Sequence, residues 1–105
     1  MSKLPTEVTN PTIQLPVNYD EIGPSERRIV REEYIKIQEG ICHHCKSPLF
    51  GEFSKEVKAM WIDRSLFPTG FFDHPVHLHH NHKTGMAIGA VHAYCNAVLW
   101  QYHGE

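Results

Sequence analysis

The chain has 105 residues, with 10 Lys+Arg, 12 Asp+Glu and a formal net charge of −2 at pH 7. This length fits one domain, and the near-neutral charge excludes a bulk polycation, so any surface that binds nucleic acid must be local. No apolar run reaches the roughly 18 residues of a membrane span and no apolar segment follows the first lysine, so we expect a cytoplasmic protein without a secretory signal or a membrane partner.

The first 23 residues predict an extended N-terminal arm or a loosely ordered tail. Pro5, Pro11 and Pro16 interrupt every short apolar stretch of this segment. Proline lacks the backbone donor and restricts the residue before it, so a regular element here would be short. We therefore divide the chain into an arm, residues 1–23, and one domain, residues 24–105.

A helix over 26–39 follows the arm, with Ser25 as its N-cap and Gly40 as its stop. Arginines and glutamates alternate near its beginning. Mixed charges of this kind are typical of a solvated face and less often of a surface that touches phosphate. The same helix is a candidate homodimer interface, or it simply covers the core. Its apolar stripe consists of Ile29, Val30, Tyr34, Ile35 and Ile37.

The remaining segments alternate between turn-rich and apolar stretches, which predicts an α+β fold. In chain order they are a cysteine-bearing turn (41–50), a strand-like stretch that could equally hold a helical turn (57–66), a turn (67–70), a strand (76–80), a polar loop (81–85), a returning strand (86–91) and a helix (92–102). The two strands around the polar loop form a hairpin that leads directly into the last helix.

The cysteines predict a structural zinc site. Cys42 and Cys45 form a CxxC turn, and His92 and Cys95 repeat the same spacing near the start of the last helix. Three thiols and one imidazole are a typical ligand set for tetrahedral zinc. Such a site would join the middle of the chain to its last helix across about fifty residues and could supply much of the folding energy.

Two other interpretations of the cysteines are weaker. Three buried free thiols would not need CxxC spacing, and no βαβ pattern surrounds the turn as a redox motif requires. His43 and His44 lie between the two thiols, where they can hardly close the same tetrahedron.

Histidines are abundant, with nine in the chain, and a strand carries two of them side by side. His79 and His80 must point to opposite faces of that strand, so one can hold a metal while the other faces a substrate. Asn96 directly follows Cys95, so the zinc site would fix an amide oxygen near the start of the helix. One histidine and one amide leave open positions for phosphate on a divalent ion.

Three motifs together resemble the HNH, or ββα-metal (His-Me finger), endonucleases, and most closely the recombination endonuclease VII branch typical of bacteriophages. The resemblance covers about residues 41–100. It implies a ββα-metal core with a zinc knuckle and an N-terminal helix. The motifs are Cys42-x-x-Cys45, the segment from His79 to Gly85, and His92-x-x-Cys95-Asn96.

The resemblance also assigns roles. It implies that His80 is the general base and that His79 and Asn96 hold a catalytic divalent cation, Mg²⁺ or Mn²⁺. His79 stands where that branch has aspartate, and His92 stands where it has a cysteine. Three loop residues that would orient the base or bind the substrate are Asn81, His82 and Lys83.

The function implied is hydrolysis of DNA phosphodiesters with one metal ion and a histidine base, in the cytoplasm of a bacterial host if the chain is phage-encoded. The alternative is a non-catalytic, zinc-stabilised module that binds DNA or protein. A histidine-rich metal-storage or metal-sensing protein is a third interpretation. Four further polar residues receive no role from the sequence: Asp73, His74, His77 and His103.

Overall fold

A computed structural model describes residues 15–104, which form a small α+β unit with one two-stranded antiparallel sheet and three α-helices. Strands β1 (Val76–His80) and β2 (Ala87–His92) form the hairpin that the sequence predicted. Among the described residues, no helix has the length and apolar character needed to cross a bilayer. Residues 1–14 of the predicted arm lie outside the described part of the chain.

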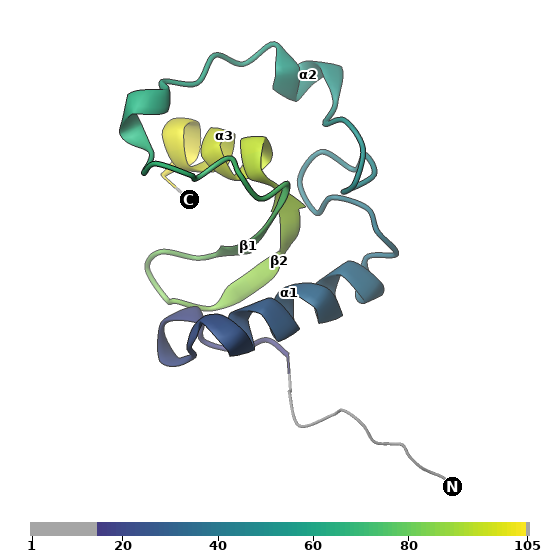
Figure 1. The fold of residues 1–105 in the computed structure, drawn as a ribbon, viewed down its shortest axis with the longest axis vertical. Helices are drawn as coiled ribbons and strands as arrows, with labels where there is room; N and C mark the ends of the chain where they lie inside the picture. The colour runs from purple at the N-terminus through teal and green to yellow at the C-terminus, as the bar shows by residue number, and fades with distance from the viewer. Residues whose placement is uncertain (1–14, 105) are drawn as a thin grey trace, which may run out of the picture.

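The hairpin lies between two helices, α1 (Pro24–Ile37) and α3 (Ala93–His103), each of which contacts both strands (Figure 1). Val30 of α1 packs on Leu78 and Ala87 to form a small core under that helix. A larger core includes Leu49 of the cysteine turn and Val98 of α3. The two helices therefore cover the sheet from opposite sides and leave the outer edge of β1 without a partner strand among the described residues.

Helix α1 begins two residues before the predicted start. Gly23 is the N-cap and Pro24 occupies the first helical position, so the prediction of Ser25 as N-cap was wrong. Proline suits this position because its missing N–H would have no helical partner and its φ is already helical. The Glu26 carboxylate accepts a hydrogen bond from the Gly23 N–H at 3.3 Å, which satisfies one more free donor.

The segment from 51 to 72 contains short helical turns instead of a strand. Helix α2 (Lys55–Lys58) has Ser54 as its N-cap, whose hydroxyl accepts from the Val57 N–H, and a 3₁₀ turn, η2, spans Arg64–Leu66. The helical alternative was therefore the correct one. The Tyr102 hydroxyl donates to the Trp61 carbonyl at 2.7 Å, which fastens this segment to the end of α3.

Residues 15–23 pack along the hairpin. The Val17 carbonyl accepts from the Ala87 N–H at 2.8 Å, and the Tyr19 N–H donates to the Gly85 carbonyl at 2.6 Å. A 3₁₀ turn, η1 (Tyr19–Glu21), then leads into α1. Gly85 has a φ of +80°, and a Cβ there would lie 2.6 Å from the Asn18 Oδ1, so this close approach requires glycine.

Candidate metal centre and active-site cleft

The four predicted zinc ligands come together at the junction of β2 and α3. The ligand atoms of Cys42, Cys45, His92 and Cys95 all lie within 4.8 Å of one another, and we call them the Cys3His cluster. The His92 Nδ1 is 3.4 Å from the Cys45 Sγ and 3.5 Å from the Cys95 Sγ. Tetrahedral zinc, with bonds of about 2.3 Å to sulfur and about 2.0 Å to nitrogen, separates such atoms by about 3.5 Å. The cluster could therefore hold a structural metal such as zinc.

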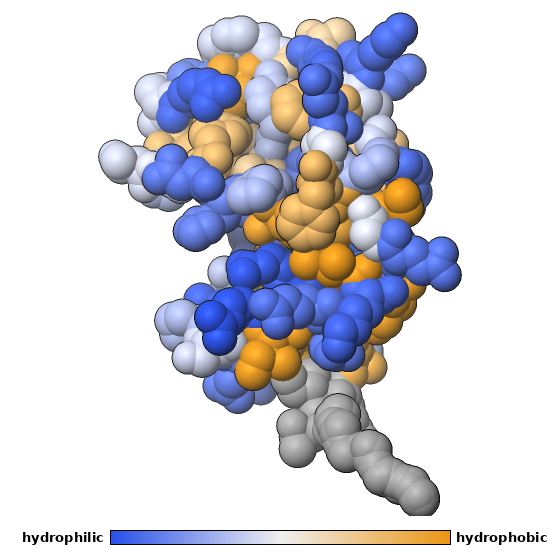
Figure 2. All heavy atoms as spheres, turned by 45° about the vertical axis from the view of Figure 1, so that its right-hand side comes forward, coloured by the Kyte–Doolittle hydropathy of each residue, from blue (hydrophilic) through white to orange (hydrophobic). Residues whose placement is uncertain are grey.

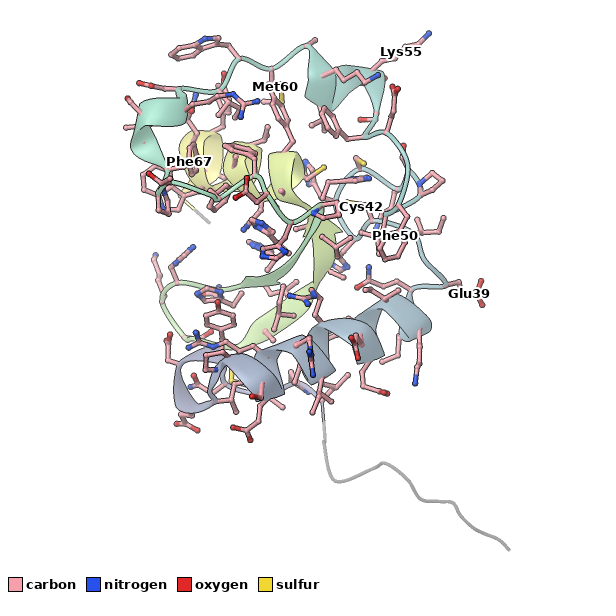
Figure 3. All side chains as sticks on the ribbon, in the orientation of Figure 1. Glu39, Cys42, Phe50, Lys55, Met60 and Phe67 are labelled. Atoms are coloured by element: carbon pink, nitrogen blue, oxygen red, sulfur yellow. The ribbon has the colours of Figure 1, made fainter. Side chains whose placement is uncertain are left out.

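The backbone around the cluster orients its ligands. The Cys42 Sγ accepts from the Cys45 N–H at 3.5 Å within the tight turn, and Figure 3 shows Cys42 pointing inward from that turn. The His92 Nε2 donates to the Pro48 carbonyl at 2.8 Å. This bond places the ring proton on Nε2 and leaves the Nδ1 lone pair facing the thiols, as a metal-binding histidine needs.

The thiols of the cluster share their protons unequally. A hydrogen bond from Cys95 lowers the pKa of Cys42 to about 4. The same bond, together with burial, raises the pKa of Cys95. A metal ion that binds all three sulfurs must therefore displace the Cys95 proton. His43 and His44 are not part of the cluster, in agreement with the preference for His92.

A second polar group lies where β1 faces the first turns of α3. The His79 Nδ1 is 3.3 Å from the Asn96 Oδ1, and His79 is buried. The hairpin thus brings together the two residues predicted to hold the catalytic cation. The His77 Nδ1 is 3.1 Å from the Asn96 Nδ2. His77 received no role from the sequence, although the two-residue period of a strand places it on the same face as His79.

His80 lies on the opposite face of β1. The Tyr19 ring stacks on the His80 ring with centroids 3.9 Å apart and an interplanar angle of 5°. The Arg27 guanidinium covers the other face of Tyr19 at 3.8 Å and donates twice to the Tyr19 carbonyl. The strand register shifts between His79 and His80, and such bulges re-aim side chains. Burial, followed by the neighbouring His82, lowers the pKa of His80, which favours the neutral ring.

A cleft of about 510 Å³ runs between α1 and the segment from 66 to 77. A notch at this level separates the α1 layer from the upper half of the molecule in Figure 2. Aromatic side chains line one wall of the cleft, among them Phe67, which Figure 3 shows beside the end of α3. Side chains from both faces of β1 line the cleft because the cleft lies along the edge of β1 that has no partner strand among the described residues. The polar residues that line the cleft are Tyr19, Arg27, Arg31, His74, His77, His80, His82 and Asn96.

The loop residues predicted to bind substrate have different surroundings. The Asn81 Oδ1 accepts from the backbone N–H groups of Lys83 and Thr84 at 2.8 and 3.0 Å, so it shapes the loop. His82 lines the cleft, with its ring centroid 4.6 Å from that of His80. Lys83 is exposed on the loop. Of the residues left without a role, His74 lines the cleft, whereas Asp73 and His103 are exposed elsewhere.

The chain matches no family model, no curated protein and no solved structure. The side chains of the cleft and the cluster are therefore the basis for the function proposed next. The sequence did not point to Tyr19 or His77. For the helix start that bears Arg27 and Arg31 it predicted a solvated face, with a phosphate-contacting surface as the less frequent alternative.

Proposed function

We propose that the protein is a metal-dependent DNA endonuclease with an HNH-type, ββα-metal core. The observation that carries the proposal is the convergence of His80, His79 and Asn96 from one hairpin and the helix that follows it, beside a cleft. A binding module has no need for a neutral histidine next to a pair of side chains that can ligate a cation. The order of the three motifs along the chain supports the same assignment.

His80 acts as the general base in this proposal. Its pKa is lowered by burial, so the ring is neutral near pH 7 and can take a proton from a water molecule beside the scissile phosphate. Tyr19 holds the ring by stacking on one face. The divalent ion held by His79 and Asn96 would stabilise the charge that develops on the phosphate and its leaving oxygen.

The α1 wall of the cleft supplies local positive charge. Arg27 and Arg31 both line the cleft, and the two salt bridges formed within residues 15–104 involve other side chains. A chain with a formal net charge of −2 can therefore still offer a basic surface to a phosphate backbone. Ile29 and Ile37 are exposed on the same helix, and the homodimer through this helix stays a prediction.

The Cys3His cluster has a supporting role. His92 is the last residue of β2 and the N-cap of α3, so a metal bound there fixes the angle between the hairpin and the helix. Asn96 follows a cluster ligand directly and is positioned by it. The non-catalytic alternative, a zinc-stabilised module that binds DNA or protein, needs this cluster but gives His80 no functional role.

Nicking of supercoiled plasmid tests the proposal. The wild-type protein should convert plasmid to the nicked form with Mg²⁺ or Mn²⁺ and not with EDTA. His80→Ala should lower the rate by about 10²–10⁴-fold, the usual contribution of a general base. His103→Ala is the matched control, because His103 is exposed at the end of α3 and does not line the cleft. DNA binding without cutting under any metal would favour the non-catalytic alternative.

A further inference from the structure

On the basis of the function proposed above, we propose that His77 is a third protein ligand of the divalent cation held by His79 and Asn96. This ligand set would make the site prefer a transition-metal ion such as Mn²⁺ or Co²⁺ over Mg²⁺. The three side chains come from adjacent positions of one strand face and from the helix that packs on it.

The distances fit ligands that share one ion. The Asn96 Nδ2 is 3.1 Å from the His77 Nδ1, and the Asn96 Oδ1 is 3.3 Å from the His79 Nδ1. Neighbouring ligand atoms of an octahedral ion with bonds of about 2.1 Å are about 3 Å apart. The His79 nitrogen and the amide oxygen therefore have the spacing of adjacent ligands, and the His77 nitrogen lies at a similar distance from the other end of the same amide.

The tautomer of His77 is also suited to a ligand. The His77 Nδ1 faces the Asn96 amide nitrogen, which donates, so Nδ1 carries a lone pair. The ring proton is therefore on Nε2, and the Phe71 ring holds the His77 ring in an edge-to-face contact with centroids 4.6 Å apart. His92 has the same tautomer in the Cys3His cluster, where the Pro48 carbonyl accepts from Nε2. A carbonyl that fixes the outer nitrogen is the usual partner of a metal-binding histidine.

His77 and His79 differ in how accessible their side chains are from the cleft. His77 and Asn96 line the cleft, whereas His79 is only 3% exposed and does not. An ion that binds the two cleft-lining side chains as well as His79 would remain open to a phosphate in the cleft. His79 alone would hold the ion deeper, behind the amide.

The composition of the site determines the preferred ion. Among the described residues that line the cleft, none is an aspartate or a glutamate. Mg²⁺ favours carboxylates and gives up its water reluctantly, whereas imidazole ligands favour transition metals. Two histidines and one amide carry no negative charge, so Mg²⁺ would bind this set weakly.

Metal binding without DNA tests the proposal. Zinc-loaded protein is titrated with Mn²⁺, free Mn²⁺ is measured by electron paramagnetic resonance, and pulsed spectra count the imidazole nitrogens on the bound ion. We expect two imidazoles in the wild type and one in His77→Ala. The Mn²⁺ affinity should fall at least about tenfold in that variant. His74→Ala is the matched control, since His74 lines the same cleft, and it should bind Mn²⁺ within about twofold of the wild type.

Several outcomes would overturn the role of His77. A single imidazole on Mn²⁺ in the wild-type protein would overturn it, and this result holds even if His77→Ala does not fold. The zinc content of His77→Ala and of a second variant, His77→Asn, shows independently whether each variant is folded. Wild-type protein that binds Mg²⁺ and Mn²⁺ equally would refute the metal preference. Metal-dependent nicking with one bound imidazole would refute His77 alone, whereas zinc-loaded protein that neither binds Mn²⁺ nor nicks DNA would also refute the proposed endonuclease.

Discussion

Removing the metal from the Cys3His cluster should lower the melting temperature by about 15–30 °C. A metal ion bound by both Cys45 and His92 would close a loop between positions 47 apart in sequence. In the chain-entropy model, closing a loop of this length stabilises the fold by about 4 kcal/mol. A domain of this size melts about 4–8 °C lower for each kcal/mol that it loses.

The assay is thermal unfolding followed by circular dichroism, with zinc content measured before and after treatment with a strong chelator. His92→Ala should reproduce the effect of the chelator, because it removes a buried ligand. His43→Ala is the matched control. His43 is exposed beside the cluster, and the hydrogen bond from its backbone N–H to the Ala90 carbonyl survives the substitution.

A melting curve that moves by less than about 5 °C after verified metal removal would refute the entropic reasoning, because the predicted loss is several times larger. Equal effects of His92→Ala and His43→Ala would refute the ligand assignment instead. The two results are separable, since the first depends on the metal and the second on which histidine binds it.

Three further predictions concern the cleft. Gly85→Ala should lower the free energy of unfolding by about 1–2 kcal/mol in chemical denaturation, because a Cβ at φ +80° is strained and would meet Asn18. The same variant should slow nicking by displacing Tyr19, and an unchanged nicking rate would argue against a role for the stack of Tyr19 on His80. Arg31→Ala should weaken DNA binding and reduce the salt slope of binding by about one, measured by fluorescence anisotropy, and an unchanged slope would remove Arg31 from the phosphate contacts. The pKa of His80 lies below its ordinary 6.5, so the nicking rate should be constant near pH 7 and fall only as acid protonates the ring; an acid limb centred above pH 6.5 would contradict this.

The features that the sequence predicted well depend on local spacing. The CxxC turn and the His92-x-x-Cys95 repeat place ligands within one turn of backbone, and the strand period separates His79 from His80. For the same reason the small α+β fold and its hairpin were predictable. The finer assignment to the ββα-metal fold rests on the resemblance and stays a prediction.

The features that the sequence did not reveal depend on packing between distant segments. Tyr19 reaches His80 only because residues 15–23 pair with the hairpin at Gly85 and Ala87, and nothing in the arm's composition indicates that pairing. Arg27 faces the cleft because of the way α1 packs on the hairpin, which a mixed charge pattern does not specify. The stretch 57–66 has strand-like residues, yet the Ser54 cap turns its beginning into a helix.

The position of His92 between β2 and α3 also bears on how the protein is made. Cys42 and Cys45 leave the ribosome first and can only half-coordinate a metal. The strand that bears His80 comes next, while Asn96 is still to be synthesised. A nascent chain that ends before Cys95 therefore contains His80 without Asn96 and without a complete Cys3His cluster. The proposed cleavage would therefore begin only after the metal has joined the two halves of the chain.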